Sequence, residues 1–488
     1  MPSPVANFLG KFTVLNGASR ELWLTFAIKL LNFAAYTVTN LTLKRWLSTE
    51  FGYTDQQALG IVALWSISMT CVTLLVGALT DAIGLRKTFF LGIWTCVIAR
   101  AVMAFAPTPW FAIGFGLFPL AIGEALGTPV LVAATRKYST TAQRSISFSG
   151  AYMMLNVGSF IASFLFDAVR QGLGEHGHMT LPVLGTTLTT YRTLFLVSLG
   201  LEVLMLPLVW LMRPGVEVTD DGVKVVPVAA RKTSGSILKD FFATIAGSAQ
   251  ETVRIFRELF RHAGFYRLIA FLLLIAFLKL IFMQMYYVFP EFGIRVLGDG
   301  APVGRLWAIN ALLIVFLSPI VGALTQRFPA YGMVTVGGII SAASVFLMAL
   351  PPAWFRPLAD GPFGQWLGHS YLGVQGDIHP YYVMIAIYVI VLSVGEAFYS
   401  PRVYEYASAI APKGHEASYA SLSYVPFLLA KLLIGTFSGV LLARYCPAVG
   451  ERQPETMWLF VALTASIAPV GLVLLRRVIR VREAGRES

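Results

Sequence analysis

Four ionisable side chains lie inside apolar stretches of the chain, and they form two matching pairs. Lys29 in IKLLNFAAY has its counterpart in Lys279 in LKLIFMQMY, and Glu124 in IGEALGTP has its counterpart in Glu396 in VGEAFYSP. A charge in apolar surroundings is costly and usually marks an ion pathway or a pair. A carboxylic acid can take up and release a proton, and a lysine can neutralise its anion. The chemistry that these residues predict is proton binding and charge pairing.

Helical spacing places the lysine and the acid of each pair at comparable depths. At a rise of 1.5 Å per residue, Lys29 lies about 13 Å and Glu124 about 18 Å from the same end of their apolar stretches. We therefore expect Lys29 to reach Glu124 and Lys279 to reach Glu396, although a static pair that only stabilises packing is an open alternative. Weaker candidates, nearer a helix end or without a repeat partner, are Arg100, Glu202, Asp167, Arg402, Glu405 and Lys431. Candidate cavity polar groups, each equally explained as a packing contact, are Asn32, Tyr36, Asn156, Gln284, Tyr286 and Tyr287.

The composition identifies the elements that must position these groups. Of the 488 residues, 57% are hydrophobic and 13% are charged, with a mean hydropathy of +0.71. A soluble domain cannot cover its surface with so little polar area. We predict an all-α polytopic membrane protein with twelve transmembrane helices, near 22–43, 57–80, 88–106, 110–134, 146–169, 191–212, 266–289, 303–325, 331–354, 380–408, 418–443 and 456–475.

The basic residues predict the orientation. One set of loops, with both termini, carries 23 Lys and Arg residues, and the opposite set carries 9. The positive-inside rule places both termini in the cytoplasm of a multi-pass plasma or inner membrane protein. The net charge of +12 thus reflects topology and not nucleic-acid binding.

The chain divides into two similar halves. A third repeat, VGALT, begins at Val76 and again at Val321. We predict two pseudo-symmetric six-helix bundles at 1–213 and 266–476, a linker at 214–265 with an amphipathic helix from Ser236, and a basic tail at 477–488. The second half carries an outward-facing insertion, Pro351–Tyr381, which we expect to be dispensable for folding.

GALTDAIGLRK resembles the loop motif between spans two and three of the major facilitator superfamily. The match falls on Gly77, Asp81, Gly84, Arg86 and Lys87. The resemblance implies a facilitator fold and a gate in which Asp81 and Arg86 form charge-assisted bonds.

Three further stretches are similar to the proton-dependent oligopeptide transporter branch of that superfamily: FSGAYMMLNVGSFI from Phe148, LWAINALLIVFLSPIVG from Leu306 and VGEAFYSPRVYEYASAIAP from Val394. The charges of the branch's first-span motif fall here on Ile28, Leu31 and Asn32, and its span-four lysine falls on Thr128. Only the span-ten acid is kept, as Glu396. Span one thus gains a lysine and span four an acid, which leaves a peptide substrate in doubt.

The leading hypothesis is a monomeric secondary transporter, coupled to protons, that moves a small solute across the bilayer by alternating access. Glu396 is the residue that we expect to carry the coupling. The sequence has no Gly-x-Ser-x-Gly, His-Glu-x-x-His or Gly-rich nucleotide loop. The cluster Glu175-His176-Gly177-His178 has residues that can bind a metal, but exposed loop histidines are the simpler interpretation. We therefore expect no enzyme activity, no metal and no cofactor. A receptor or chaperone built on the same fold is the alternative, and a membrane-embedded enzyme is a more remote one.

Overall fold

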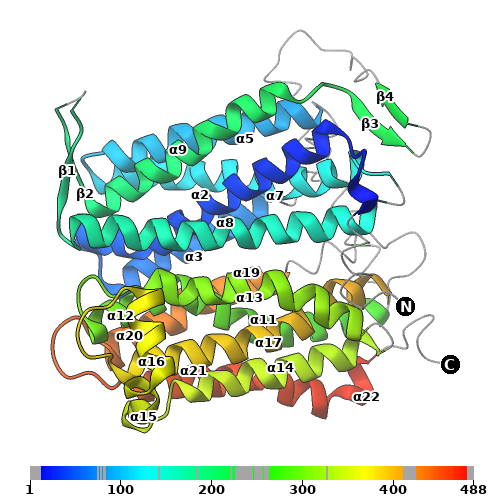
Figure 1. Cartoon of the computed structure of the whole chain (residues 1–488). Coiled ribbons are helices and arrows are strands. Elements are labelled where there is room, and N and C mark those ends of the chain that lie inside the picture. The colour runs from blue at the N-terminus through cyan, green and yellow to red at the C-terminus, as the bar shows by residue number, and fades with distance from the viewer. Residues whose placement is uncertain are drawn as a thin grey trace. The chain divides into compact units, whose positions relative to one another are not determined.

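The computed structural model describes residues 13–73, 76, 80, 84–140, 143–182, 185–219, 222–225, 246, 257, 263–325, 328–409 and 425–480. These residues are mostly helical (Figure 1). Eleven of the described helices are long and apolar enough to cross a membrane. The predicted span 418–443 is described from Val425, where α19, η5 and α20 follow one another to Tyr445. The predicted all-α polytopic fold is confirmed.

The first half contains α2 (Arg20–Phe51), α3 (Asp55–Thr73), α5 (Leu85–Phe105), α6 (Pro109–Phe111), η2 (Ala112–Leu117), α7 (Phe118–Lys137), α8 (Arg144–Leu173) and α9 (Thr190–Leu211). The second half contains α11 (Ala263–Tyr287), α12 (Phe289–Leu297), α13 (Val303–Leu324), α14 (Ala330–Leu347), α17 (Pro380–Ala409), α19 (Val425–Leu433), η5 (Ile434–Ser438), α20 (Gly439–Tyr445), α21 (Pro454–Leu474) and α22 (Arg476–Ile479). Two antiparallel hairpins, β1 (His178–Thr180) with β2 (Thr187–Thr189) and β3 (Val216–Thr219) with β4 (Gly222–Val225), flank α9 in sequence (Figure 1).

The chain packs as two compact units. Unit 1 comprises Met1–Thr39, Ser68–Ala162 and Arg192–Arg254, and unit 2 comprises Asn40–Ile67, Ser163–Tyr191 and Ile255–Ser488. The units divide α2, α3 and α8 along their lengths, because one end of each helix packs with helices of the second half. The predicted amphipathic helix of the linker lies outside the described residues.

Small residues place the two repeat-related acids. In unit 1, a Cβ on Gly123 of α7 would lie 2.5 Å from Cys96 Sγ of α5. In unit 2, a Cβ on Gly395 of α17 would lie 2.3 Å from Ser341 Oγ of α14. Each glycine directly precedes an acid, so the same close helix contact fixes Glu124 in one unit and Glu396 in the other.

Two features of the second half concern the backbone around Glu396 and the insertion. The helix α17 runs unbroken through Pro401, so the backbone around Glu396 is not interrupted. The insertion is a series of short helices: η3 (Pro352–Phe355), α15 (Arg356–Asp360), α16 (Pro362–Gln365) and η4 (Trp366–Leu372). Its side chains Phe355, Leu367 and Leu372 are buried. It is therefore a packed part of unit 2 and not a loose loop.

Candidate functional site

Glu396 lies in a buried polar cluster of unit 2. Asn310 of α13 donates from Nδ2 to Glu396 Oε2 at 2.9 Å and to Ser393 Oγ at 3.0 Å. Lys279 of α11 donates to Ser400 Oγ at 3.1 Å, and its Nζ lies 4.9 Å from the ring centroid of Tyr399. Glu396 is 9% exposed and Lys279 is 4% exposed. The cluster thus contains one acid and one cation, and a neutral amide donates a hydrogen bond to the acid.

The expected direct pair of Lys279 with Glu396 is not formed among the described residues. Ser400, one turn beyond Glu396 on α17, takes the lysine's hydrogen bond instead. Both charged groups therefore belong to one cluster, in which Lys279 donates to Ser400 and Glu396 accepts from Asn310.

The expected pair of Lys29 with Glu124 is wrong. Glu124 is bonded by Arg100 of α5, whose Nη2 contacts Glu124 Oε1. Because α5 and α7 approach closely at Gly123, the guanidinium of Arg100, and not the ammonium group of Lys29, pairs with Glu124. Lys29 instead lies over the ring of Phe33, with Nζ 4.4 Å from the centroid, and forms no ion pair within the described residues.

Arg100 has further partners that connect three helices. Its Nη1 donates to Glu202 Oε1 of α9 at 2.9 Å, and its Nε donates to Ser198 Oγ at 2.6 Å. Arg100 and Glu202 are fully buried. We name Arg100, Glu124 and Glu202 the Arg100 triad. Sequence reasoning ranked Arg100 and Glu202 low because neither has a counterpart in the second half.

The predicted cavity residues fall into both units. In unit 1, Asn32 is 8% exposed and a Cβ on Gly127 would lie 3.2 Å from its Nδ2. Asn156 donates to Tyr152 O of its own helix at 3.0 Å, and Tyr36 lies 5.8 Å from Phe33 between ring centroids. In unit 2, Gln284 donates to Ser438 Oγ at 2.5 Å. The bonds of Asn156 and Gln284 are those of packing contacts.

The gate motif is described in part. Gly77 and Asp81 lie outside the described residues. Gly84 has a φ of 85°, which favours glycine, and directly precedes α5. Arg86 donates to Trp210 O at 2.7 Å and to Val209 O at 3.3 Å. These carbonyls belong to the last turn of α9, where carbonyls lack the usual helical partner; Val209 O also accepts from the backbone N–H of Met212 at 3.2 Å. Arg86 therefore caps α9, whereas no role for Lys87 follows from the described contacts.

Sequence analysis missed a second charged cluster, which lies wholly in unit 2. Glu291 of α12 is 1% exposed and contacts Lys44 at 3.0 Å, Arg295 at 3.1 Å and Arg45 at 3.3 Å. Asp55 contacts Lys44 at 2.6 Å and Arg295 at 2.8 Å. We name these five residues, with Asp167, Arg170 and Glu175, the Glu291 network. From the sequence, Lys44 and Arg45 of α2 contribute only to the count of basic residues that predicts orientation. Two adjacent basic residues near a helix end, followed by Asp55 at the start of the next helix, also indicate an ion pair.

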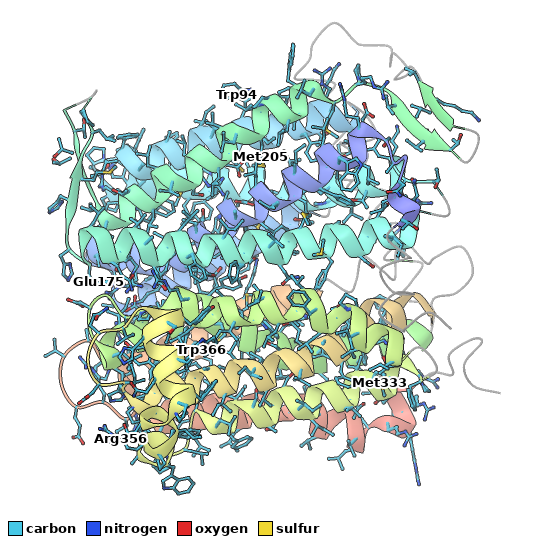
Figure 2. All side chains as sticks on the ribbon, in the orientation of Figure 1. Trp94, Glu175, Met205, Met333, Arg356 and Trp366 are labelled. Carbon is cyan, nitrogen blue, oxygen red and sulfur yellow. The ribbon has the colours of Figure 1, made fainter. Side chains whose placement is uncertain are left out.

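Glu175 and Asp167 extend this network along α8. Glu175, which follows α8 (Figure 2), accepts from Arg170 Nη2 and Tyr191 Oη and contacts Arg45 at 3.4 Å. Burial favours its neutral form, but these bonds outweigh burial and lower the pKa of Glu175 to about 2. Asp167 accepts from the backbone N–H of Gly304 at 3.0 Å and of Arg305 at 2.7 Å, at the start of α13. The network therefore ties the ends of α2, α3 and α8 to α12 and α13.

The apolar spans define a multi-pass helical membrane protein, and charges buried among them are typical of transporters and channels. The family model "Major Facilitator Superfamily" matches residues 25–367, so the chain belongs to that superfamily. It is a secondary transporter of small solutes and not an enzyme.

Two kinds of relative are similar to the chain. Dipeptide and tripeptide permease A of Proteus mirabilis (strain HI4320) is 23% identical over 373 residues, which cover 68% of this chain and 72% of the permease. A POT family transporter solved in complex with 5-aminolevulinic acid has a TM-score of 0.67 at 15% identity and covers 95% of this chain and 97% of its own. The tetrameric PepTSo2 structure has a TM-score of 0.68 at 16% identity, and the match covers 94% of this chain and 98% of the PepTSo2 chain. The structural likeness establishes the fold.

Proposed function

We propose that the chain is a proton-coupled symporter of a small solute that carries both an ammonium and a carboxylate group. The observation that supports this most is the unit 2 cluster, in which Glu396 is buried yet accepts from Asn310, a neutral donor. A buried acid held by a neutral amide can alternate between accepting an ammonium group and accepting a proton. Lys279 in the same cluster stabilises the ionised form.

The cations of the two units support the carboxylate part of the proposal. Lys29 lies over Phe33 without an ion-pair partner among the described residues, and its side chain is 7% exposed. A buried ammonium group in this position gains most from an incoming anion. The named relatives transport dipeptides and tripeptides or bind 5-aminolevulinic acid, which are solutes with both groups.

The first-span charges of the oligopeptide branch are absent, at Ile28, Leu31 and Asn32. We therefore propose that the solute is bound by an arrangement of charges that differs from that of the oligopeptide branch. A peptide is one member of this solute class, and a smaller amino acid is another. We further propose that the protein works as a monomer in the inner membrane with both termini in the cytoplasm.

Transport by the purified protein in proteoliposomes tests the proposal. Vesicles with an imposed pH gradient are offered labelled dialanine, trialanine or 5-aminolevulinic acid, and uptake is compared with and without a protonophore. We expect at least one solute to accumulate above its external concentration, and the protonophore to abolish that accumulation. Solute binding without any translocation would instead support the receptor alternative, and accumulation that ignores the protonophore would refute proton coupling.

A further inference from the structure

The Arg100 triad has one positive charge and two acids in a buried place. Arg100 uses Nη1 for Glu202 Oε1 at 2.9 Å and Nη2 for Glu124 Oε1. The exposed fraction is 0% for Arg100 and Glu202 and 6% for Glu124. Two ionised carboxylates around one guanidinium would leave a net negative charge in an apolar bundle, which is expensive. One bound proton makes the triad neutral.

The hydrogen bonds indicate which oxygen is available for that proton. Glu202 Oε2 is buried and has no hydrogen-bond partner within the described residues. One ligand atom from each of Glu202, Glu124 and Cys96 lies within 4.8 Å of the others. An orphaned carboxylate oxygen close to a second carboxylate is the position at which a proton relieves like-charge repulsion. Among the described residues, the charged or titratable side chains around Glu202 are Arg100, Glu124 and Cys96.

A small cavity lies beside this site. It is just large enough for a water molecule and is lined by, among others, Asn32, Cys96, Gly127 and Glu202. The cavity lies wholly in unit 1 and extends from the span-one candidate Asn32 to the acid on α9. A metal ion does not fit the same donors, because the guanidinium of Arg100 already lies between the two carboxylates.

We infer that the Arg100 triad is a second proton-binding site, separate from Glu396, in which Glu124 and Glu202 share one proton that resides on Glu202 Oε2. The role of this proton in transport rests on the proposed function. Its presence does not, because it can be measured without any solute.

Infrared difference spectroscopy of the full-length protein in lipid tests the inference. The carbonyl stretch of a protonated carboxylic acid is recorded at neutral pH for the wild type and for Glu202→Gln, Glu124→Gln and Glu396→Gln. We expect Glu202→Gln to lose the absorbance of one carboxylic acid. Glu124→Gln should lose the same amount, because Glu202 then ionises as the single anionic partner of Arg100. The signal of the triad should persist in Glu396→Gln.

The charge balance also makes a prediction about folding. Each single glutamine variant keeps Arg100 neutralised and should yield folded protein, whereas the double variant Glu124→Gln/Glu202→Gln leaves the guanidinium unpaired and should melt at a clearly lower temperature. An unchanged carbonyl band in both single variants, or failure of both to fold, would refute the inference.

A transport readout separates this inference from the proposed function. Reversal-potential measurements should show that Glu202→Gln moves one proton fewer per solute than the wild type. If proton-driven transport is absent altogether but the band shifts as expected, the proposed function fails and the proton site stands. If transport is proton-driven but the band and the stoichiometry are unchanged, the proton site fails and the proposed function stands.

Discussion

Replacing Glu291 with glutamine tests the Glu291 network most directly. The carboxylate of Glu291 contacts Lys44, Arg45 and Arg295, and all three cations are mostly buried, with side-chain exposed fractions of 2%, 13% and 8%. Glutamine keeps the shape of the side chain but removes its charge. Among the described residues, Asp55 then remains as the acidic partner of Lys44 and Arg295, and Glu175 as that of Arg45.

The expected cost follows from this burial. Removing one partner of a buried ion pair typically destabilises a protein by about 3–5 kcal/mol, because a charge remains buried without compensation. We expect Glu291→Gln to lower the free energy of unfolding by an amount in this range. A matched control is Asp360→Asn, which removes the acid of an exposed pair with Arg356 in the same unit, where the side-chain exposed fractions are 55% and 57%. Such exposed pairs contribute at most about 1 kcal/mol.

Thermal unfolding in detergent measures the two variants side by side. A second variant, Glu291→Gln/Lys44→Met, removes one of the cations left uncompensated and should recover part of the loss. If Glu291→Gln and Asp360→Asn have the same melting temperature, the network contributes no more to stability than an exposed ion pair, and the reasoning from burial is wrong. No recovery in the double variant would show that the loss arises from something other than unpaired charge.

Glu396→Gln should abolish accumulation of solute against its gradient but leave exchange of solute across the membrane intact, because exchange needs no net proton step. Intact proton-driven accumulation in this variant would exclude Glu396 as the coupling acid. Low pH should destabilise unit 2. Burial alone would raise the pKa of Glu175, but its bonds to Arg170 lower this pKa from the ordinary value of 4.5 to about 2. The stability that these bonds contribute is therefore fully present above about pH 4.5 and is lost as the pH falls towards 2. Unfolding curves from pH 7 to pH 3 measure this, and a flat profile would contradict it. Arg86→Ala should slow turnover but leave solute affinity within about a few-fold of the wild type, because the bonds of Arg86 to the end of α9 bias a conformational equilibrium and do not contact the solute. Parallel binding and uptake assays measure this, and a collapse of solute affinity would show that the assignment of Arg86 to the gate is wrong.

The fold and the acids could be predicted from the sequence, and their partners only in part. Apolar stretches of sufficient length determine helices in a bilayer, and the repeat identified Glu124 and Glu396 as equivalent positions. Lys29 was paired with Glu124 on depth alone. Depth along a helix does not specify which neighbouring helix faces a residue, and α5, with Arg100, faces Glu124 through Gly123.

The Glu291 network was missed for a related reason. Its members come from α2, α3, α8 and α12, and each one alone reads as a charge near a helix end. The positive-inside rule counts such residues as signals of orientation and says nothing of their partners. Only packing brings Lys44 within 3.0 Å of Glu291, across a separation of almost 250 positions.

The two repeat-related acids occupy equivalent positions but cannot perform the same task. Gly123 and Gly395 place Glu124 and Glu396 by the same close helix contact. Glu124 then forms an ion pair with Arg100, whose guanidinium keeps its positive charge at every physiological pH. Glu396 meets the amide of Asn310, which binds either form of the acid. Arg100 bonds both Glu124 and Glu202 but neutralises only one negative charge. In our inference Glu124 stays ionised, and Glu202, whose Oε2 has no hydrogen-bond partner among the described residues, carries the exchangeable proton of unit 1. An acid held by an amide is free to exchange a proton for a solute ammonium group, which supports our proposal that solute coupling lies in the second half of the repeat.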